Sequence, residues 1–198
     1  SYNEILKYFK RAEHNETFDD EFHGQGGPLN VSKIRHENKP TKDFVEAGSK
    51  LYKYHEDFNG EEQEGIGFYQ TTQKDGKRCS TAKAYLVPAL DRTNLTVITE
   101  ANVNKILIDN QKASGVEYID VEGQSHIISA SKEVLLCSGA FGSPQILLRS
   151  GVGPKGEIEK HGIEHKVDLS GVGKNLQDHI DYLTVHKYNS MQFIGTSI

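Results

Sequence analysis

One segment in the second half of the chain carries the strongest chemical signal. Glu133–Cys137 is an apolar run typical of a strand covered on both faces. A glycine-rich turn, Ser138–Gly142, follows, and Ser143 and Pro144 suit the N-cap and first position of a helix that ends at Gly151. A strand, a glycine loop and a helix in this order aim backbone N–H groups at a nucleotide. The alternative is that the glycines only let the helix fold back against its strand.

Three further groups have residue types suited to catalysis or metal binding. Asp178 and His179 resemble a base with its orienting carboxylate, but adjacent side chains seldom face each other. His161 and His165 have the spacing of metal ligands on one helix face, but a glycine between them ends the predicted helix. Cys137–Ser138 lies at a strand-to-turn junction without the G-x-S-x-G frame of a nucleophile elbow. We therefore predict no catalytic residue and no metal site from these groups.

Aromatic side chains gather in the first half of the chain. Such rings either line a pocket, where they attract a quaternary ammonium group, or pack against the core. We favour packing. The residues concerned are Tyr52, Tyr54, Phe58, Phe68 and Tyr69.

Helices and long loops predominate in the region before residue 93. Residues 3–13 place apolar side chains on one helical face, with Asn3 as the N-cap. A polar loop over residues 14–27 leads into a short strand at Leu29–Val31. A second helix is predicted from Pro40 to Leu51, followed by an acidic loop over residues 56–67.

The pattern changes near residue 94, where short runs rich in Val, Ile and Thr alternate with turn residues. These runs predict a β-meander of four strands. Together with the flanking helices they predict a mixed α/β (α+β) fold. The predicted strands are Leu95–Thr99, Ala101–Asp109, Gly115–Val121 and His126–Ala130.

Composition excludes several functional classes. The 198 residues carry a formal net charge of −5 at pH 7, so no basic field favours nucleic acid. Cys79 and Cys137 form neither a disulfide framework nor a zinc motif, and reduced thiols predict a cytoplasmic protein. No apolar stretch is long enough to span a membrane. With glycine counted in place of tyrosine, the apolar share is roughly 40%, below the usual 45 to 50%, so the chain is short of core residues.

The segment Gly139–Gly153 resembles the second signature of the glucose–methanol–choline (GMC) flavoprotein oxidoreductases at every specified position. The resemblance extends over nearly the whole chain, and the choline dehydrogenase-like and aliphatic alcohol dehydrogenase-like subgroups are the most similar. The other matching segments are Phe9–Glu13, Gly27–Val31, Ala84–Pro88, Asn94–Thr99, Gly115–Glu117 and Gly171–His179.

The resemblance implies FAD as cofactor and oxidation of a primary alcohol to an aldehyde, with hydride passing to the flavin. The family's opening G-x-G-x-x-G fingerprint and its closing catalytic His are not among these 198 residues. Gly24–Pro28 follows an acidic loop and contains proline, so we interpret it as a turn. The sequence therefore resembles the central part of a longer enzyme. Residues 1–93 would belong to the substrate-binding cap, residues 94–167 to the FAD-binding domain, and residues 168–198 to a connection back to the cap.

The resemblance also implies which residues touch the cofactor. Val103 matches a valine whose backbone contacts the adenine edge. Ser138, Gly139 and Ala140 fall where the end of a strand passes the dinucleotide. A third group lies in a loop that returns toward the flavin, where hydrogen bonds that hold the loop together are the alternative role. Its members are Asn175, Asp178 and His179.

The expected partners are an alcohol substrate and the remaining segments of the full-length enzyme, and a second copy of the chain is a further candidate. Association with the inner membrane would be peripheral. By itself the chain is expected to be inactive, to bind FAD weakly, and to be marginally stable or oligomeric. Choline, a longer aliphatic alcohol and an aryl alcohol remain open as substrates, as do oxidase and dehydrogenase chemistry. The rival functions are a non-catalytic binding module and a related flavoprotein that acts on other donors.

Overall fold

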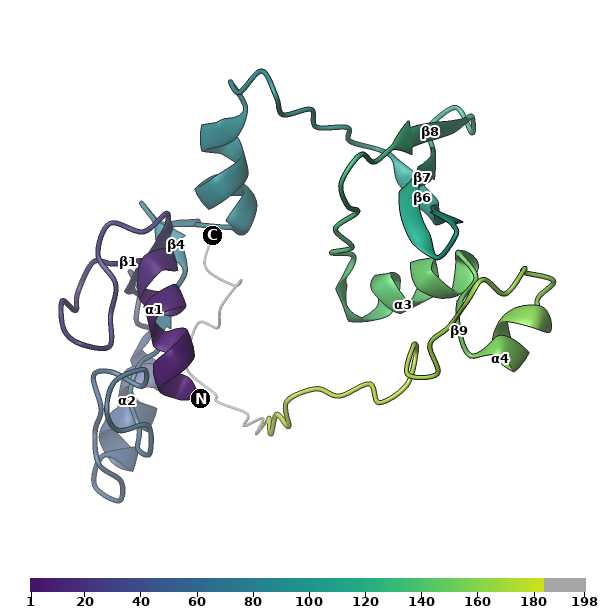
Figure 1. Cartoon of the computed structure of the whole chain (residues 1–198). Coiled ribbons are helices and arrows are strands. Elements are labelled where there is room, and N and C mark those ends of the chain that lie inside the picture. The colour runs from purple at the N-terminus through teal and green to yellow at the C-terminus, as the bar shows by residue number, and fades with distance from the viewer. Residues whose placement is uncertain (184–198) are drawn as a thin grey trace. The chain divides into compact units, whose positions relative to one another are not determined.

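A computed structural model describes residues 1–183 of the chain, in two compact units that divide between Thr96 and Val97. Helices and strands are present in both units (Figure 1), so the fold is of the mixed α/β class. No helix among the described residues is long and apolar enough to cross a bilayer. The predicted connection over residues 168–198 lies outside the described residues from position 184 onward.

The first unit is built around a small three-stranded sheet of order β1-β2-β3. β2 pairs in parallel with β1 and antiparallel with β3, and a separate antiparallel hairpin joins β4 to β5. A short π-helix, η1, and a 3-10 turn, η2, complete the unit. The bounds are α1 Tyr2–Ala12, β1 Glu13–Asn15, β2 Leu29–Lys33, α2 Lys39–Gly48, β3 Gln70–Thr71, β4 Gln73–Lys74, β5 Lys77–Arg78, η1 Ala82–Leu86 and η2 Val87–Ala89.

Polar side chains occupy much of the interior of the first unit. Asn15 is 2% exposed, and its side-chain amide donates to Glu13 and Gln70. Its Oδ1 accepts from the backbone amides of Thr17 and Phe18. Because every polar atom of this buried amide has a partner, hydrogen bonds rather than a large apolar core hold the sheet to its loops.

The second unit contains an antiparallel sheet of order β6-β7-β8, the predicted meander. Helix α3 packs against β6 (Figure 1), and a parallel pair, β9 and β10, lies beside a short helix, α4. Ile106, Ile146 and Ile158 are among its buried apolar residues. The bounds are β6 Asn102–Asp109, β7 Lys112–Ile119, β8 Ser125–Ser129, α3 Gly139–Arg149, β9 Val152–Gly153, α4 Lys155–Glu159 and β10 Val167–Asp168.

Two predicted strands are absent from the structure. Leu95–Thr99 and Glu133–Cys137 are both irregular backbone. A strand is stabilised by ladder hydrogen bonds to a neighbour, and no described segment pairs with either run. Leu135 is accordingly 77% exposed rather than buried in a sheet. The meander therefore has three strands instead of four.

Helix boundaries also differ from the predictions. α1 begins after Ser1 rather than after Asn3, and α3 begins at Gly139, five residues before the predicted first helical residue Pro144. The second predicted helix is present as α2, capped by Asn38, but Leu51 lies beyond its end and Val45 is its buried residue. Strand β1 was not predicted, because its sequence Glu-His-Asn is polar and its pairing with β2 is non-local.

Turns and loops agree better with the sequence. The predicted strand at Leu29–Val31 is confirmed within β2, and Gly24–Pro28 forms bends that lead into it. The backbone N–H of Gly27 donates to the carbonyl of Glu13 at 2.9 Å, which brings the loop back to β1. Cys79 and Cys137 are both free thiols, as expected.

Candidate functional site

The start of α3 is the first component of the candidate site. The backbone at Gly139 has φ +80°, a left-handed conformation that L side chains rarely adopt, and a Cβ there would meet only open space. The chain turns at this glycine and enters the helix, whose first amides have no partner within the helix. Ser143 does not cap the helix as predicted. Instead its Oγ accepts from the backbone N–H of Ser138 at 3.1 Å and holds the turn in place.

A surface groove of about 520 Å³ lies beside the first turns of α3. Ala140, Phe141 and Pro144 form one wall, and residues 173–177 form the other. The second wall contains Asn175, which has a positive φ of 54°, a left-handed conformation that Asn adopts more readily than most residues. The groove therefore joins a helix N-terminus, which carries partial positive charge, to a loop that supplies polar backbone and amide groups.

One cation borders this groove. Lys174 Nζ donates to Glu157 Oε1 at 2.5 Å, and both side chains are nearly half exposed. This hydrogen bond and the charge of Lys174 hold the pKa of Glu157 below its ordinary value. Exposed pairs of this kind contribute little to stability, so Lys174 is free to exchange Glu157 for an anionic ligand at small cost. The electrostatics of the groove thus suit an anion or a ligand edge rich in carbonyl oxygens.

Val103 lies in β6, which is an edge strand of its sheet. Its pairing partner in β7 is Tyr118, and the register shifts between Val103 and Lys105. An edge strand has one row of backbone groups outside the ladder, and such groups can bind a ligand edge. Ser150 already uses this edge, since its Oγ accepts from the N–H of Ile106 at 2.8 Å.

The structure brings some of the predicted site residues together and leaves others apart. Ala140 and Asn175 are 35 positions apart in the sequence yet border the same groove, and Ser138 and Gly139 directly precede Ala140. Val103 is not among the residues that line it. The remaining predictions, Asp178 and His179, are exposed on the segment beyond the groove.

Asp178 and His179 do not form a catalytic pair in the described structure. The bond between them runs from the backbone N–H of His179 to Asp178 Oδ1 at 2.8 Å, not from the imidazole. This geometry is that of a side chain that stabilises its own loop.

Phe141 and Pro144 line the groove but were not predicted as site residues. Pro144 lies four positions beyond Ala140 and three beyond Phe141, so helical spacing places it beside both of them. The signal was missed because the sequence placed the start of the helix at Ser143. Among the aromatic residues of the first unit, the rings of Phe58 and Tyr69 lie 5.0 Å apart. Tyr52, Tyr54 and Tyr69 are nevertheless exposed, so the predicted packing is only partial.

Comparison with known proteins identifies the class to which this chain belongs. The sequence profile described as GMC oxidoreductase matches residues 1–181. The chain therefore belongs to the GMC oxidoreductase family, whose members are FAD-binding oxidoreductases.

Individual relatives agree with this assignment. The chain is 45% identical over 192 residues to an alcohol dehydrogenase (acceptor) of Pseudomonas putida, covering 96% of this chain and 35% of the relative. It is 41% identical to an oxygen-dependent choline dehydrogenase of Sinorhizobium fredii, covering 92% of this chain and 33% of the relative. The crystal structure of pyridoxine 4-oxidase from Mesorbium loti superposes with a TM-score of 0.83 at 32% identity, covering 90% of this chain and 35% of that one. The chain thus spans about a third of the length of its relatives.

Proposed function

We propose that this chain supplies part of the FAD site of an oxidoreductase that converts a primary alcohol to an aldehyde. The observation that carries the proposal is the groove at the N-terminus of α3, where Ala140 and Asn175 meet. Both residues were predicted from the sequence to contact the cofactor, and they come from segments far apart in the chain. FAD, when bound, supplies the acceptor for the hydride of the alcohol.

The residues present fit one part of a dinucleotide. The turn at Ser138 and Gly139 leaves open space beside the first amides of α3, where phosphate or ring oxygens would be stabilised by the helix dipole. Val103 would offer main-chain groups of the edge strand to the adenine. Asn175, Asp178 and His179 would approach from the opposite loop.

The two units would have different tasks. Residues 94–167 would form part of the FAD-binding domain, and residues 1–93 part of the substrate-binding cap. The division of the structure beside Thr96 supports this assignment. The substrate class is supported by the names of the relatives, an alcohol dehydrogenase (acceptor) and choline dehydrogenases, and an aliphatic or choline-like alcohol is our choice.

The proposal is tested by titrating the 198-residue chain with FAD and with ADP, using calorimetry and flavin fluorescence. We expect weak, saturable FAD binding and no turnover of choline or a linear primary alcohol with an artificial acceptor. Ala140→Glu would place a carboxylate in the groove at the helix N-terminus. It should weaken FAD binding by at least about tenfold, since repulsion of the pyrophosphate adds to the loss of space.

Gln145→Glu is the matched control. It adds the same charge to an exposed position of α3 that does not line the groove, so FAD affinity should stay within about twofold. Equal affinities of the Ala140→Glu variant and the unmodified chain would refute the placement of FAD in this groove. Absence of any flavin binding would favour the non-catalytic binding module. Stoichiometric flavin with alcohol turnover would contradict the prediction that this chain holds only part of the site.

A further inference from the structure

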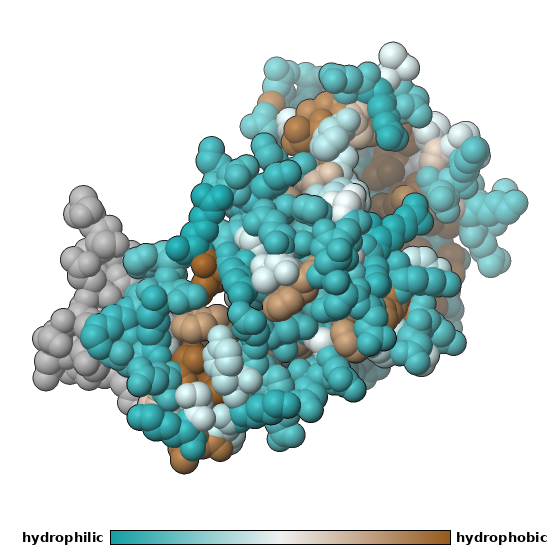
Figure 2. Space-filling view, turned by 90° about the vertical axis from the view of Figure 1, so that its left-hand side faces the viewer, coloured by the Kyte–Doolittle hydropathy of each residue, from teal (hydrophilic) through white to brown (hydrophobic). Residues whose placement is uncertain are grey.

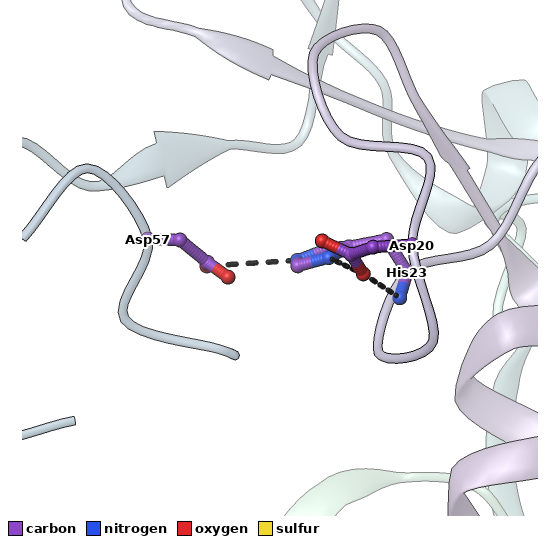
Figure 3. Close-up of side chains that lie close together, drawn as sticks. All are labelled: Asp20, His23 and Asp57. Carbon is purple, nitrogen blue, oxygen red and sulfur yellow. Dashed lines mark hydrogen bonds and ion pairs between the residues drawn. The ribbon is translucent and has the colours of Figure 1, made fainter. Parts of the chain in front are cut away.

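A second cluster of functional side chains lies in the first unit, away from α3. His23 comes from the loop between β1 and β2, next to Asp20, and Asp57 comes from the segment between α2 and β3 (Figure 3). His23 Nδ1 lies 2.8 Å from Asp20 Oδ1, and Nε2 lies 3.5 Å from Asp57 Oδ1. The side chain of His23 is only 2% exposed. The imidazole is therefore buried with one carboxylate at each ring nitrogen.

Asp20 determines which ring nitrogen carries a proton. Its Oδ1 also accepts from the backbone amides of Phe22 at 2.9 Å and His23 at 3.1 Å. Because this oxygen already accepts from two backbone amides, it is an acceptor toward the ring as well, so His23 Nδ1 is the donor of the 2.8 Å hydrogen bond.

The other ring nitrogen then faces Asp57 without a hydrogen bond. His23 Nε2 is buried and has no hydrogen-bond partner among the described residues. Asp57 Oδ1 accepts from the backbone N–H of Asn59 at 2.8 Å, so it too is an acceptor. Two acceptors that face each other in a buried position are unfavourable unless positive charge lies between them.

The separation of these two atoms distinguishes a metal ion from a proton. An N–H···O bond between a ring nitrogen and a carboxylate measures about 2.7 to 2.9 Å, shorter than the 3.5 Å observed. Zn²⁺ binds imidazole nitrogen and carboxylate oxygen at about 2.0 to 2.2 Å, and two such ligands at a tetrahedral angle are about 3.4 Å apart. The observed distance matches two ligands of one ion.

We propose that His23 and Asp57 are ligands of a divalent cation of the Zn²⁺ type, with Asp20 positioning the imidazole through its second nitrogen. A carboxylate on the distal ring nitrogen of a ligand histidine is the usual outer partner in zinc sites. The three residues offer ligand atoms that all lie within 4.8 Å of one another.

An adjacent cavity gives the ion a path of entry and room for water. A pocket of about 270 Å³ is lined by His23, Asn59 and Gln63 together with apolar side chains of α1 and β2. It has room for water molecules, which would complete the coordination. The ion would tie the loop before β2 to the segment before β3. This site is structural and does not depend on the proposed flavin function.

The experiment uses the 198-residue chain stripped of metal with a chelator. Titration with Zn²⁺ by calorimetry should show one equivalent bound, and Co²⁺ should give a visible absorption band typical of mixed nitrogen and oxygen ligands. Bound Zn²⁺ should raise the temperature of unfolding, since the ion binds only the folded site. In the unmodified chain, Zn²⁺ should shift the Nε2 resonance of a single histidine in a nitrogen-15 NMR spectrum.

Variants assign the site to these residues. His23→Gln and Asp57→Asn should each lower the Zn²⁺ affinity at least about 100-fold, and Asp20→Asn about 10-fold to 100-fold. The matched control is His126→Gln, which removes an imidazole bonded to Asp120 at 2.6 Å on an exposed hairpin. Its Zn²⁺ affinity should stay within about twofold of the unmodified chain.

Three results would overturn the proposal. The first is the absence of stoichiometric Zn²⁺ and Co²⁺ binding by the unmodified chain at about 100 times the protein concentration. The second is Zn²⁺ affinity that survives both His23→Gln and Asp57→Asn. The third is an NMR spectrum in which His23 remains doubly protonated when Zn²⁺ is added, which would show that a proton occupies the position. The NMR measurement needs no variant, so it decides even if the substitutions prevent folding.

Discussion

Single side chains connect the elements of the second unit, and Ser150 is the clearest case. It is 4% exposed at the end of α3. Its Oγ accepts from the N–H of Ile106 in β6 at 2.8 Å and donates to the carbonyl of Ile146 at 2.6 Å. One hydroxyl thus satisfies a backbone group of the sheet edge and joins it to the helix, because a hydroxyl can donate and accept at once.

Ser150→Ala should destabilise the chain by about 1 to 3 kcal/mol, because the buried N–H of Ile106 loses its acceptor. Urea unfolding followed by circular dichroism measures the change. Ser170→Ala, at an exposed position, is the control and should change stability by less than about 0.5 kcal/mol. Equal midpoints for the two variants would mean that water replaces the hydroxyl at Ile106.

At the scale of elements, Gly151 connects α3 to the parallel pair β9 and β10. Its φ is +83°, as predicted for a glycine just beyond a helix C-terminus. Its carbonyl accepts from the amides of Lys166 at 2.8 Å and Val167 at 3.1 Å. A Cβ at this position would lie 2.3 Å from the carbonyl oxygen of Glu164. Backbone conformation and packing therefore both require glycine here.

Replacing two glycines should have effects of opposite sign. Gly151→Ala combines a left-handed φ with a backbone clash and should cost about 2 kcal/mol or more. Gly156→Ala, inside α4 where a Cβ meets nothing within 4 Å, should stabilise the chain by about 0.5 to 1 kcal/mol. Thermal unfolding of both variants beside the unmodified chain provides the comparison. A tolerated Gly151→Ala would show that β9 and β10 do not hold the end of α3.

At the scale of the whole molecule, many large apolar side chains are exposed. Phe141 is 78% exposed, Leu135 77% and Leu176 63%. On the face shown in Figure 2, hydrophobic residues lie among the predominantly hydrophilic ones. Each of these side chains would gain roughly 1.5 to 3 kcal/mol from full burial, so the surface favours further contacts.

We therefore expect the isolated chain to self-associate and to bind the dye ANS. Light scattering after gel filtration should show a mass that rises with concentration over the micromolar range. Leu135→Lys should reduce this association with little effect on stability, because the side chain is exposed and its backbone lies outside every strand. A monomer that binds no dye at all concentrations would contradict the expectation.

Local sequence signals predicted much of the second unit correctly. The meander followed from β-branched runs separated by turn residues, and Gly151 from the position of glycine beyond a helix. The predicted strand bounds left residues 110–114 as the turn between β6 and β7. In the structure the turn is shorter, because Asn110 and Gln111 both adopt a positive φ and close the hairpin with two residues. The predicted start of α3 lay too far along the chain, because Gly139 turns the chain directly into the helix.

The sequence by itself determined the family and its cofactor, because these depend on short motifs, and it predicts the residues that would hold the cofactor. Only the tertiary structure brought Ala140 together with Asn175, and His23 together with Asp20 and Asp57. It also left Glu133–Cys137 without a partner strand. The physical reason is the same in each case. Pairing and proximity depend on contacts between segments far apart in the chain, and no local propensity encodes where those segments meet.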